Sequence, residues 1–239
     1  MALPDDLRLN QLLAALPHDI LQRWEPHFEL VDLALGQVLY QPGTTMSHVV
    51  FPTTAIVALL YGMENGDTTE IAVVGNEGMV GIALFMGGDS TPSSGVVQSA
   101  GRGVRLKGGF IKAEFESGGP VLHLLLRFTQ ALITQMAQTT VCNRLHSLDQ
   151  QLCRLLLLCM DRLRGNELAM TQEVIANMLG VRRGGVTEAA LDLQRVGLIR
   201  YSRGHITMLD RQRLELRACE CYSVVRREYD RLLPPRTAT

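Results

Sequence analysis

The hydrophobic positions of the first hundred residues follow two different patterns. Apolar residues at helical spacing predict two short helices, over residues 7–16 and 19–24. From about residue 29 to 107, short apolar runs recur roughly every ten residues and are separated by Gly, Pro, Asn and Asp. Many short strands at this spacing predict a β-sandwich or barrel. The sequence Glu-Asn-Gly-Asp at 64–67 predicts a hairpin turn within it, since Asn-Gly readily adopts positive φ angles.

The longest periodic stretch follows the Gly-Gly-Pro sequence at 118–120. Apolar residues at three- and four-residue steps, from Leu125 to Leu163, predict one helix of about 40 residues that ends near Gly165. A helix longer than about 25 residues favours coiled-coil-like pairing. We therefore expect a dimerisation helix. The alternative is two consecutive helices within the core of a monomer.

Residues 170–208 have the pattern of two helices, a tight turn between them and a hairpin after them. Gly180, which tolerates left-handed backbone angles, separates the two helical runs. With Arg near the start of the second run, this order is typical of a helix-turn-helix, and alternating residues around the turn at 202–204 predict a wing. The alternative is an ordinary pair of packed helices with a hairpin. We expect a final helix over 211–233 and a disordered tail over 234–239.

The charge is distributed unevenly along this chain of 239 residues, although its net charge is only −1. Residues 1–143 carry seven Lys and Arg against 13 Asp and Glu, whereas residues 144–239 carry 16 Arg against 11 acidic residues. A basic C-terminal part on an acidic chain is typical of a regulator with a separate DNA-binding domain.

The sequence argues against several classes of protein. The N-terminus is acidic rather than a secretory signal, and no uncharged apolar run reaches membrane-spanning length, so we expect a soluble cytoplasmic protein. The nucleophile, phosphate-binding and zinc-protease motifs of enzymes are missing, and we expect no catalytic residues. A sensing module that acts only through protein partners is a further alternative, which the basic helix-turn-helix disfavours.

The five cysteines, an odd number without a CxxC pair, argue against a disulfide framework. Cys219 and Cys221 fall on the expected final helix, where residues two apart do not share a face. We therefore expect buried thiols, no cofactor and no metal site. Thiol sensing by Cys142, Cys153 or Cys159 is kept as an alternative.

Three segments of the sequence resemble the Crp/Fnr family of bacterial transcription regulators, namely 174–199, 35–59 and 76–85. The resemblance implies an α+β protein with an N-terminal β-roll of the cyclic-nucleotide-binding type, a long dimerisation helix and a C-terminal winged helix-turn-helix. It also implies a homodimer that binds double-stranded DNA at an inverted-repeat operator, with RNA polymerase as a candidate partner. The expected domains are 1–117, 118–165 and 166–239.

The segment 76–85 occupies the place of the family's phosphate-binding cassette, and its neighbourhood supplies the ligand-pocket candidates. Cyclic-nucleotide binders of the family use a Gly-rich turn, a Glu for the ribose hydroxyl, and an Arg followed by Ser or Thr for the phosphate. Here Ile82 stands where Glu is expected, and no Lys or Arg occurs between Arg23 and Arg102. We therefore expect no control by cyclic AMP. A regulator that senses another small molecule or a redox signal, in the roll or in the dimer helix, is the alternative. The pocket candidates are Gly78, Gly81, Ile82, Ser93 and Ser94.

The same resemblance places the N-terminal end of the second helix of the helix-turn-helix in the major groove. Arg182 and Arg183 are the candidates for base or phosphate contacts, because Arg can bond both acceptors of guanine. Glu188 would either accept a hydrogen bond from cytosine or pair with a neighbouring Arg, and we favour the pairing. The phosphate contacts would position the domain without reading sequence. The full set of DNA-binding candidates is Thr171, Gln172, Arg182, Arg183, Thr187, Glu188, Ser202, Arg203 and His205.

Overall fold

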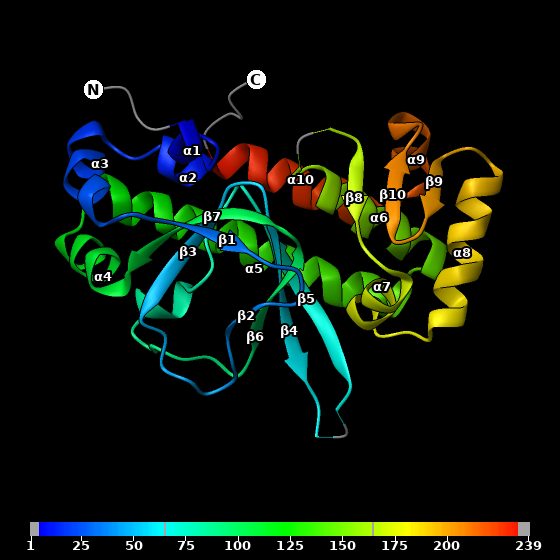
Figure 1. The fold of residues 1–239 in the computed structure, drawn as a ribbon, viewed down its shortest axis with the longest axis horizontal. Coiled ribbons are helices and arrows are strands. Elements are labelled where there is room, and N and C mark those ends of the chain that lie inside the picture. Colours follow the sequence, from blue (N-terminus) through cyan, green and yellow to red (C-terminus); the bar gives the residue numbers. More distant parts are fainter. Residues whose placement is uncertain (1–4, 65, 164, 234–239) are drawn as a thin grey trace.

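A computed structural model describes residues 5–64, 66–163 and 165–233 of the chain (Figure 1). The tail expected over 234–239, and Asn65 of the expected hairpin turn, lie outside the described residues. No helix in the described ranges is both long and apolar enough to span a membrane.

Of the two predicted N-terminal helices, the one over 19–24 is confirmed and the one over 7–16 is divided. The division comes from Asn10, which caps the second short helix with its side chain by accepting hydrogen bonds from the N–H groups of Leu12 and Leu13. The amide of Asn10 also donates to the carbonyl oxygens of Pro52 and Gly78, which ties this corner to the roll. The elements are α1 (Asp5–Arg8), α2 (Gln11–Ala14), α3 (His18–Trp24) and the 3-10 helix η1 (Glu25–His27).

The predicted short strands form a β-roll of two antiparallel sheets. One sheet has the order β1-β7-β3 and the other β2-β6-β4-β5. The strands are β1 (Glu29–Leu33), β2 (Val38–Tyr40), β3 (His48–Pro52), β4 (Ile56–Gly62), β5 (Thr68–Val74), β6 (Ser94–Ser99) and β7 (Gly101–Lys107), with the 3-10 helix η2 (Ile82–Leu84) between β5 and β6.

The prediction of one 40-residue helix is wrong, because the chain forms α5 (Pro120–Leu145) and α6 (Leu148–Met160) after the short α4 (Gly108–Ser117). His146 and Ser147 take extended backbone angles, and Ser147 forms a capping box with Gln150 that starts α6. Apolar periodicity runs through the break because α6 is buried on all sides.

The C-terminal part contains the expected helix pair and wing. Its elements are β8 (Glu167–Ala169), α7 (Gln172–Leu179), α8 (Arg183–Arg195), β9 (Ile199–Ser202), β10 (His205–Met208), α9 (Arg211–Arg217) and α10 (Glu220–Leu232). The strands form a sheet of order β8-β10-β9.

The final helix expected over 211–233 is also two helices. Ala218 and Cys219 are extended, so Cys219 caps α10 instead of lying inside a helix. Figure 1 shows α10 returning from the winged end of the molecule to lie beside α5, against which it packs.

One continuous cluster of buried apolar side chains joins the roll, α5, α6 and the helix-turn-helix. The helix α7 packs against β5, where Gly180 approaches Thr69. The α+β class, with an N-terminal roll and a C-terminal winged helix-turn-helix, is confirmed.

Candidate DNA interface and candidate ligand cavity

The turn between α7 and α8 has the geometry that its sequence predicts. Thr171 caps α7 by accepting a hydrogen bond from the N–H of Val174 at 3.3 Å. Gly180 ends the helix with φ of 65°, in the left-handed region. Eight apolar residues at helical spacing in the two helices are buried, which determines the faces that remain for solvent. They are Ile175, Ala176, Met178, Leu179, Val186, Ala189, Ala190 and Leu193.

The N-terminal end of α8 is open and cationic. Arg182 is its N-cap residue and Arg183 its first residue, and both side chains are exposed. Neither guanidinium forms an ion pair with another described residue. A side chain at Gly184 would meet no atom within 4 Å, so this side of the first turn is open, whereas Gly185 faces Leu148.

The wing ends in a two-residue turn, Arg203-Gly204, between the paired residues Ser202 and His205. Both turn residues have positive φ, 49° and 82°, as a type I′ hairpin requires. Glycine or asparagine is favoured at such positions, so the exposed Arg203 adopts a backbone conformation that is unfavourable for its residue type. Ser202 and His205 are exposed beside it.

Two of the predicted contact residues bond to each other. The Thr187 hydroxyl lies 2.8 Å from Oε1 of Gln172 and 3.0 Å from the carbonyl oxygen of Arg183. This bond joins the start of α7 to the first turns of α8. The preferred pairing of Glu188 with a neighbouring Arg is not observed: Glu188 is exposed and has no ion-pair partner among the described residues.

Two residues that the sequence analysis missed hold the wing on the helices. The backbone N–H of Tyr201 donates to Oε1 of Gln194 at 2.8 Å, and the Tyr201 hydroxyl donates to the carbonyl oxygen of Met170 at 3.1 Å. A lone amide and a lone phenol have no spacing signal in the sequence that would have revealed this role.

Three of the five predicted pocket residues of the roll line one cavity. A cavity of about 340 Å³ is lined by Gly81, Ile82 and Ser93, and on the α5 side by Leu132 and Met136.

Two other candidates lie outside this cavity. A Cβ atom at Gly78 would come within 2.3 Å of the Phe128 ring, so that glycine serves the approach of α5 to the roll. Ser94 is the first residue of β6 and is not part of the cavity lining.

The cavity is largely apolar. Its described lining contains no Lys, Arg, Asp or Glu. The hydroxyl of Ser93 is already close to the Tyr40 hydroxyl, at 3.3 Å, and to Oγ1 of Thr91, at 3.1 Å. Burial raises the pKa of Tyr40, which keeps the phenol neutral. Such a lining suits a small uncharged ligand better than an anion.

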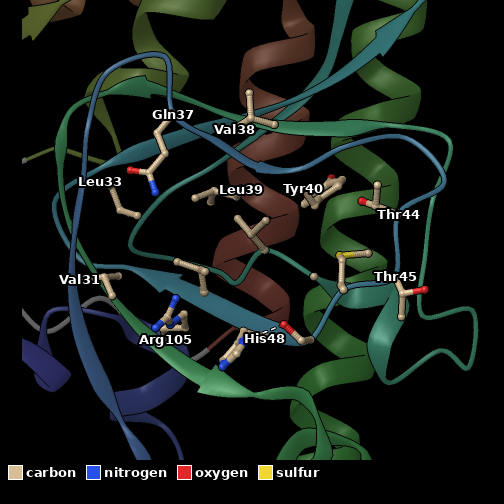
Figure 2. A pocket seen from close by; sticks show the side chains of 15 residues that line it. Val31, Leu33, Gln37, Val38, Leu39, Tyr40, Thr44, Thr45, His48 and Arg105 are labelled. Carbon is tan, nitrogen blue, oxygen red and sulfur yellow. Dashed lines mark hydrogen bonds between the residues drawn. The ribbon is translucent and has the colours of Figure 1, made fainter.

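A second cavity of about 250 Å³ lies on the other side of Tyr40 and Gly81, between β1, β2 and β3 (Figure 2). Arg105 and His48 belong to its lining. The guanidinium of Arg105 forms an ion pair with Glu29, so its charge is already balanced.

One buried cation lies beside the cassette. It is supplied by the residue Arg162, just after α6, and it is paired with an acidic residue of the cassette. Arg162, which follows α6, donates from Nε to Glu77 at 2.7 Å, and both side chains are buried. Arg162 also donates to Oε1 of Gln135 on α5 at 2.7 Å, and its guanidinium carbon lies 5.6 Å from the centre of the Tyr229 ring on α10. This buried network joins the cassette to α5, α6 and α10.

A group of potential metal ligands lies away from both cavities, at the C-terminal end of α5. It consists of Cys142, His146, Cys219 and Cys221.

Comparisons with known proteins agree with this arrangement. Residues 150–217 match the family model of the Crp-like helix-turn-helix domain. No curated protein matches the sequence.

Several solved structures share the fold. A putative transcriptional regulator of the Crp/Fnr family from Eubacterium rectale aligns with 18% identity and a TM-score of 0.66, over 87% of this chain and 97% of that one. FixK2 from Bradyrhizobium japonicum aligns with 16% identity and a TM-score of 0.67, over 80% and 98%. The c-di-GMP responsive regulator CLP from Xanthomonas campestris aligns with 12% identity and a TM-score of 0.61, over 81% and 100%.

Proposed function

We propose that the chain is a transcription regulator of the Crp/Fnr type that acts as a homodimer on an inverted-repeat operator. The match of residues 150–217 to the Crp-like helix-turn-helix domain and the shared fold support this proposal. In this proposal it acts in the cytoplasm, without catalysis and without control by cyclic AMP, and RNA polymerase is its candidate partner. In this proposal residues 1–117 form the sensor-like domain, residues 118–165 form the dimer contact, and residues 166–239 bind DNA.

The observation that carries the proposal is the open N-terminal end of α8. Arg182 and Arg183 are exposed beside the open Gly184 and have no acidic partner among the described residues. Arginine in that position can bond the two acceptors of guanine in the major groove. The unusual backbone angle of Arg203 supports a second contact, because it places a cation at the wing tip, where a phosphate would lie.

The support for a homodimer comes from α5. Its inner face packs on the roll, yet the opposite face carries exposed apolar side chains, with Ile133 56% exposed. Such a stripe at steps near seven and four residues is typical of helices that pair. The stripe consists of Leu126, Ile133, Val141 and Leu145.

The lining of the 340 Å³ cavity supports independence from cyclic AMP. A phosphodiester buried there would need a cation, and the described lining has none. The same argument keeps us from extending to this chain the c-di-GMP response of the Xanthomonas regulator. If an effector occupies this cavity, its chemistry is that of a small, mostly apolar molecule.

The test is DNA binding by the purified protein without effector, measured by fluorescence anisotropy. A fragment from upstream of its own gene and random DNA are compared over a range of salt concentrations, and an unbiased operator selection is run in parallel. We expect selected sites with two-fold symmetry, bound about 1,000-fold or more tightly than random DNA. Selection of no common sequence, with equal binding to all DNA, would contradict the proposal.

A further inference from the structure

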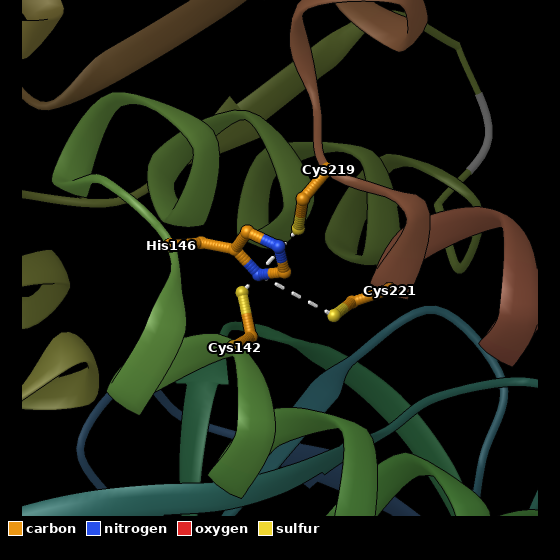
Figure 3. A group of neighbouring side chains, drawn as sticks. All are labelled: Cys142, His146, Cys219 and Cys221. Carbon is orange, nitrogen blue, oxygen red and sulfur yellow. Dashed lines mark hydrogen bonds between the residues drawn. The ribbon is translucent and has the colours of Figure 1, made fainter.

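Four side chains from two distant parts of the sequence converge where α5 ends and α10 begins (Figure 3). Cys142 and His146 are one helical turn apart at the end of α5, and Cys219 and Cys221 lie at the start of α10. The three cysteines are buried, and the His146 side chain is only 14% exposed. The expectation that Cys219 and Cys221 point apart does not apply, because Cys219 precedes the helix.

Two distances within the cluster are close to those between neighbouring ligand atoms of a tetrahedral metal ion. The ligand atoms of all four residues lie within 4.8 Å of one another. The sulfur atoms of Cys142 and Cys219 are 3.4 Å apart, and Nδ1 of His146 is 3.6 Å from the sulfur of Cys221. Zn–S bonds of about 2.3 Å and Zn–N bonds of about 2.0 Å place two sulfur atoms about 3.8 Å apart, and a sulfur and a nitrogen atom about 3.5 Å apart, in tetrahedral geometry.

The surroundings of His146 prepare it as a ligand. Its Nε2 atom lies 3.4 Å from a carboxylate oxygen of Glu220. A proton on Nε2 leaves the lone pair of Nδ1 facing the sulfur atoms. Metal-bound histidines are commonly oriented by a carboxylate in this way. The backbone beneath is fixed too, since the amide of Gln151 donates to the carbonyl oxygen of His146 at 2.9 Å.

Three buried thiols can supply thiolate ligands, because a divalent metal that binds among them would displace their protons.

A buried cation lies nearby. Arg154 forms no salt bridge within the described residues, although its charge acts on the buried carboxyl of Glu70, and its guanidinium donates to the Thr139 hydroxyl at 3.2 Å. It would balance the single negative charge of a zinc ion with three thiolates and one imidazole.

We propose that Cys142, His146, Cys219 and Cys221 bind one zinc ion in a tetrahedral site. Three sulfur ligands and one nitrogen ligand, all protein-derived, are the set typical of structural zinc. The ion links the junction of α5 and α6, through Cys142 and His146, to the start of α10, through Cys219 and Cys221. Its role is to hold the C-terminal helix in place, and this role does not depend on the DNA-binding function proposed above.

The test begins with the full-length protein, purified under reducing conditions and supplied with zinc. We expect one zinc ion per chain by elemental analysis, and a lower melting temperature after removal of the metal by a chelator. With cobalt(II) as the probe, we expect the near-ultraviolet charge-transfer bands of cobalt–thiolate bonds and the visible bands of tetrahedral cobalt.

Substitutions separate this site from nonspecific metal binding. Cys219→Ser should weaken zinc binding at least 100-fold and abolish the cobalt–thiolate spectrum, whereas Cys159→Ser, at a buried cysteine outside the cluster, should keep both. Glu220→Gln should weaken zinc binding about 10- to 100-fold through the orientation of His146. His146→Cys should retain a tetrahedral cobalt spectrum, because sulfur replaces nitrogen.

Three results would overturn the proposal. One is wild-type protein without stoichiometric zinc and without a cobalt–thiolate spectrum. Another is a spectrum that survives in Cys219→Ser. The third is a Cys142–Cys219 disulfide that forms in the presence of zinc and reductant, which would assign the pair to redox chemistry instead.

Discussion

At the scale of single residues, the buried carboxyl of Glu70 on β5 makes stability depend on pH. Burial raises its pKa to about 7 from the ordinary 4.5, although Arg154 and Arg162 act in the opposite direction. One of its oxygen atoms has no hydrogen-bond partner among the described residues. The folded protein therefore keeps a proton that the unfolded chain loses above pH 4.5.

This difference predicts that the free energy of unfolding falls by about 3 kcal/mol as the pH rises from about 4.5 to about 7. Above pH 7 it should stay at the lower value. Glu70→Gln should remove this dependence and be more stable than the wild type at pH 8, with a smaller difference at pH 5. Urea unfolding of both proteins at the two pH values measures the effect. Parallel stability profiles for the two proteins would contradict it.

The DNA-contact residues also act singly. Arg183→Ala should lose about 1–3 kcal/mol of discrimination between operator and mismatched DNA, because a bidentate base contact is removed. Arg203→Ala should weaken binding to all DNA alike and reduce the salt slope by about one. Anisotropy titrations at several salt concentrations distinguish the two effects.

Arg23→Ala is the control for those titrations, because Arg23 lies on α3 near the N-terminus, where it pairs with Glu114, and is not a predicted DNA contact. Equal losses on specific and random DNA for Arg183→Ala would refute its role in base reading.

At the scale of elements, the exposed stripe of α5 predicts the state of association. Ile133→Glu places a charge where two helices would meet, and should convert the dimer into monomer at micromolar concentration. Leu216→Glu is the matched control, because Leu216 is even more exposed, at 85%, but lies on α9. Analytical ultracentrifugation measures both variants. A wild-type monomer, or an Ile133→Glu dimer, would contradict pairing through α5.

The sequence predicts the existence of most elements but not where three of the predicted helices are interrupted. Apolar periodicity continues through His146 and Ser147 because α6 is buried on every face, and periodicity alone cannot show such a break. The capping-box pattern of Ser147 and Gln150 was the available local signal. The helix-turn-helix was easier to predict, because its turn, its apolar faces and its wing all lie within forty residues.

At the scale of the whole molecule, the sites assembled from distant residues escaped prediction. Cys142 and Cys219 are 77 positions apart, and Glu77 and Arg162 are 85 apart. Their meeting depends on the return of α10 along α5 and on the packing of α6 beneath the cassette. No local spacing records either event.

The Glu77–Arg162 pair should matter for the stability of the whole chain. Arg162→Met leaves the Glu77 carboxylate buried without its cationic partner, with the backbone N–H of Gly75 still donating to it, and should reduce the free energy of unfolding by about 3–5 kcal/mol. Chemical denaturation measures the loss. The double variant Glu77→Gln with Arg162→Met should recover part of it, since no charge is then left unpaired. A loss in the double variant equal to the sum of the two single losses would show that the pair is not coupled.

The return of α10 along α5 means that the C-terminal part is attached to the rest of the chain at several places. It is joined through α6, through the packing of α7 on β5, and through α10, where Gln130 of α5 bonds to Glu228 at 3.2 Å. These attachments limit how the C-terminal part can move relative to α5. A change in α5 would therefore reach the recognition helices of the proposed dimer as a small rotation of the whole C-terminal part. The operator property most sensitive to it would be the spacing between half-sites, and not their sequence.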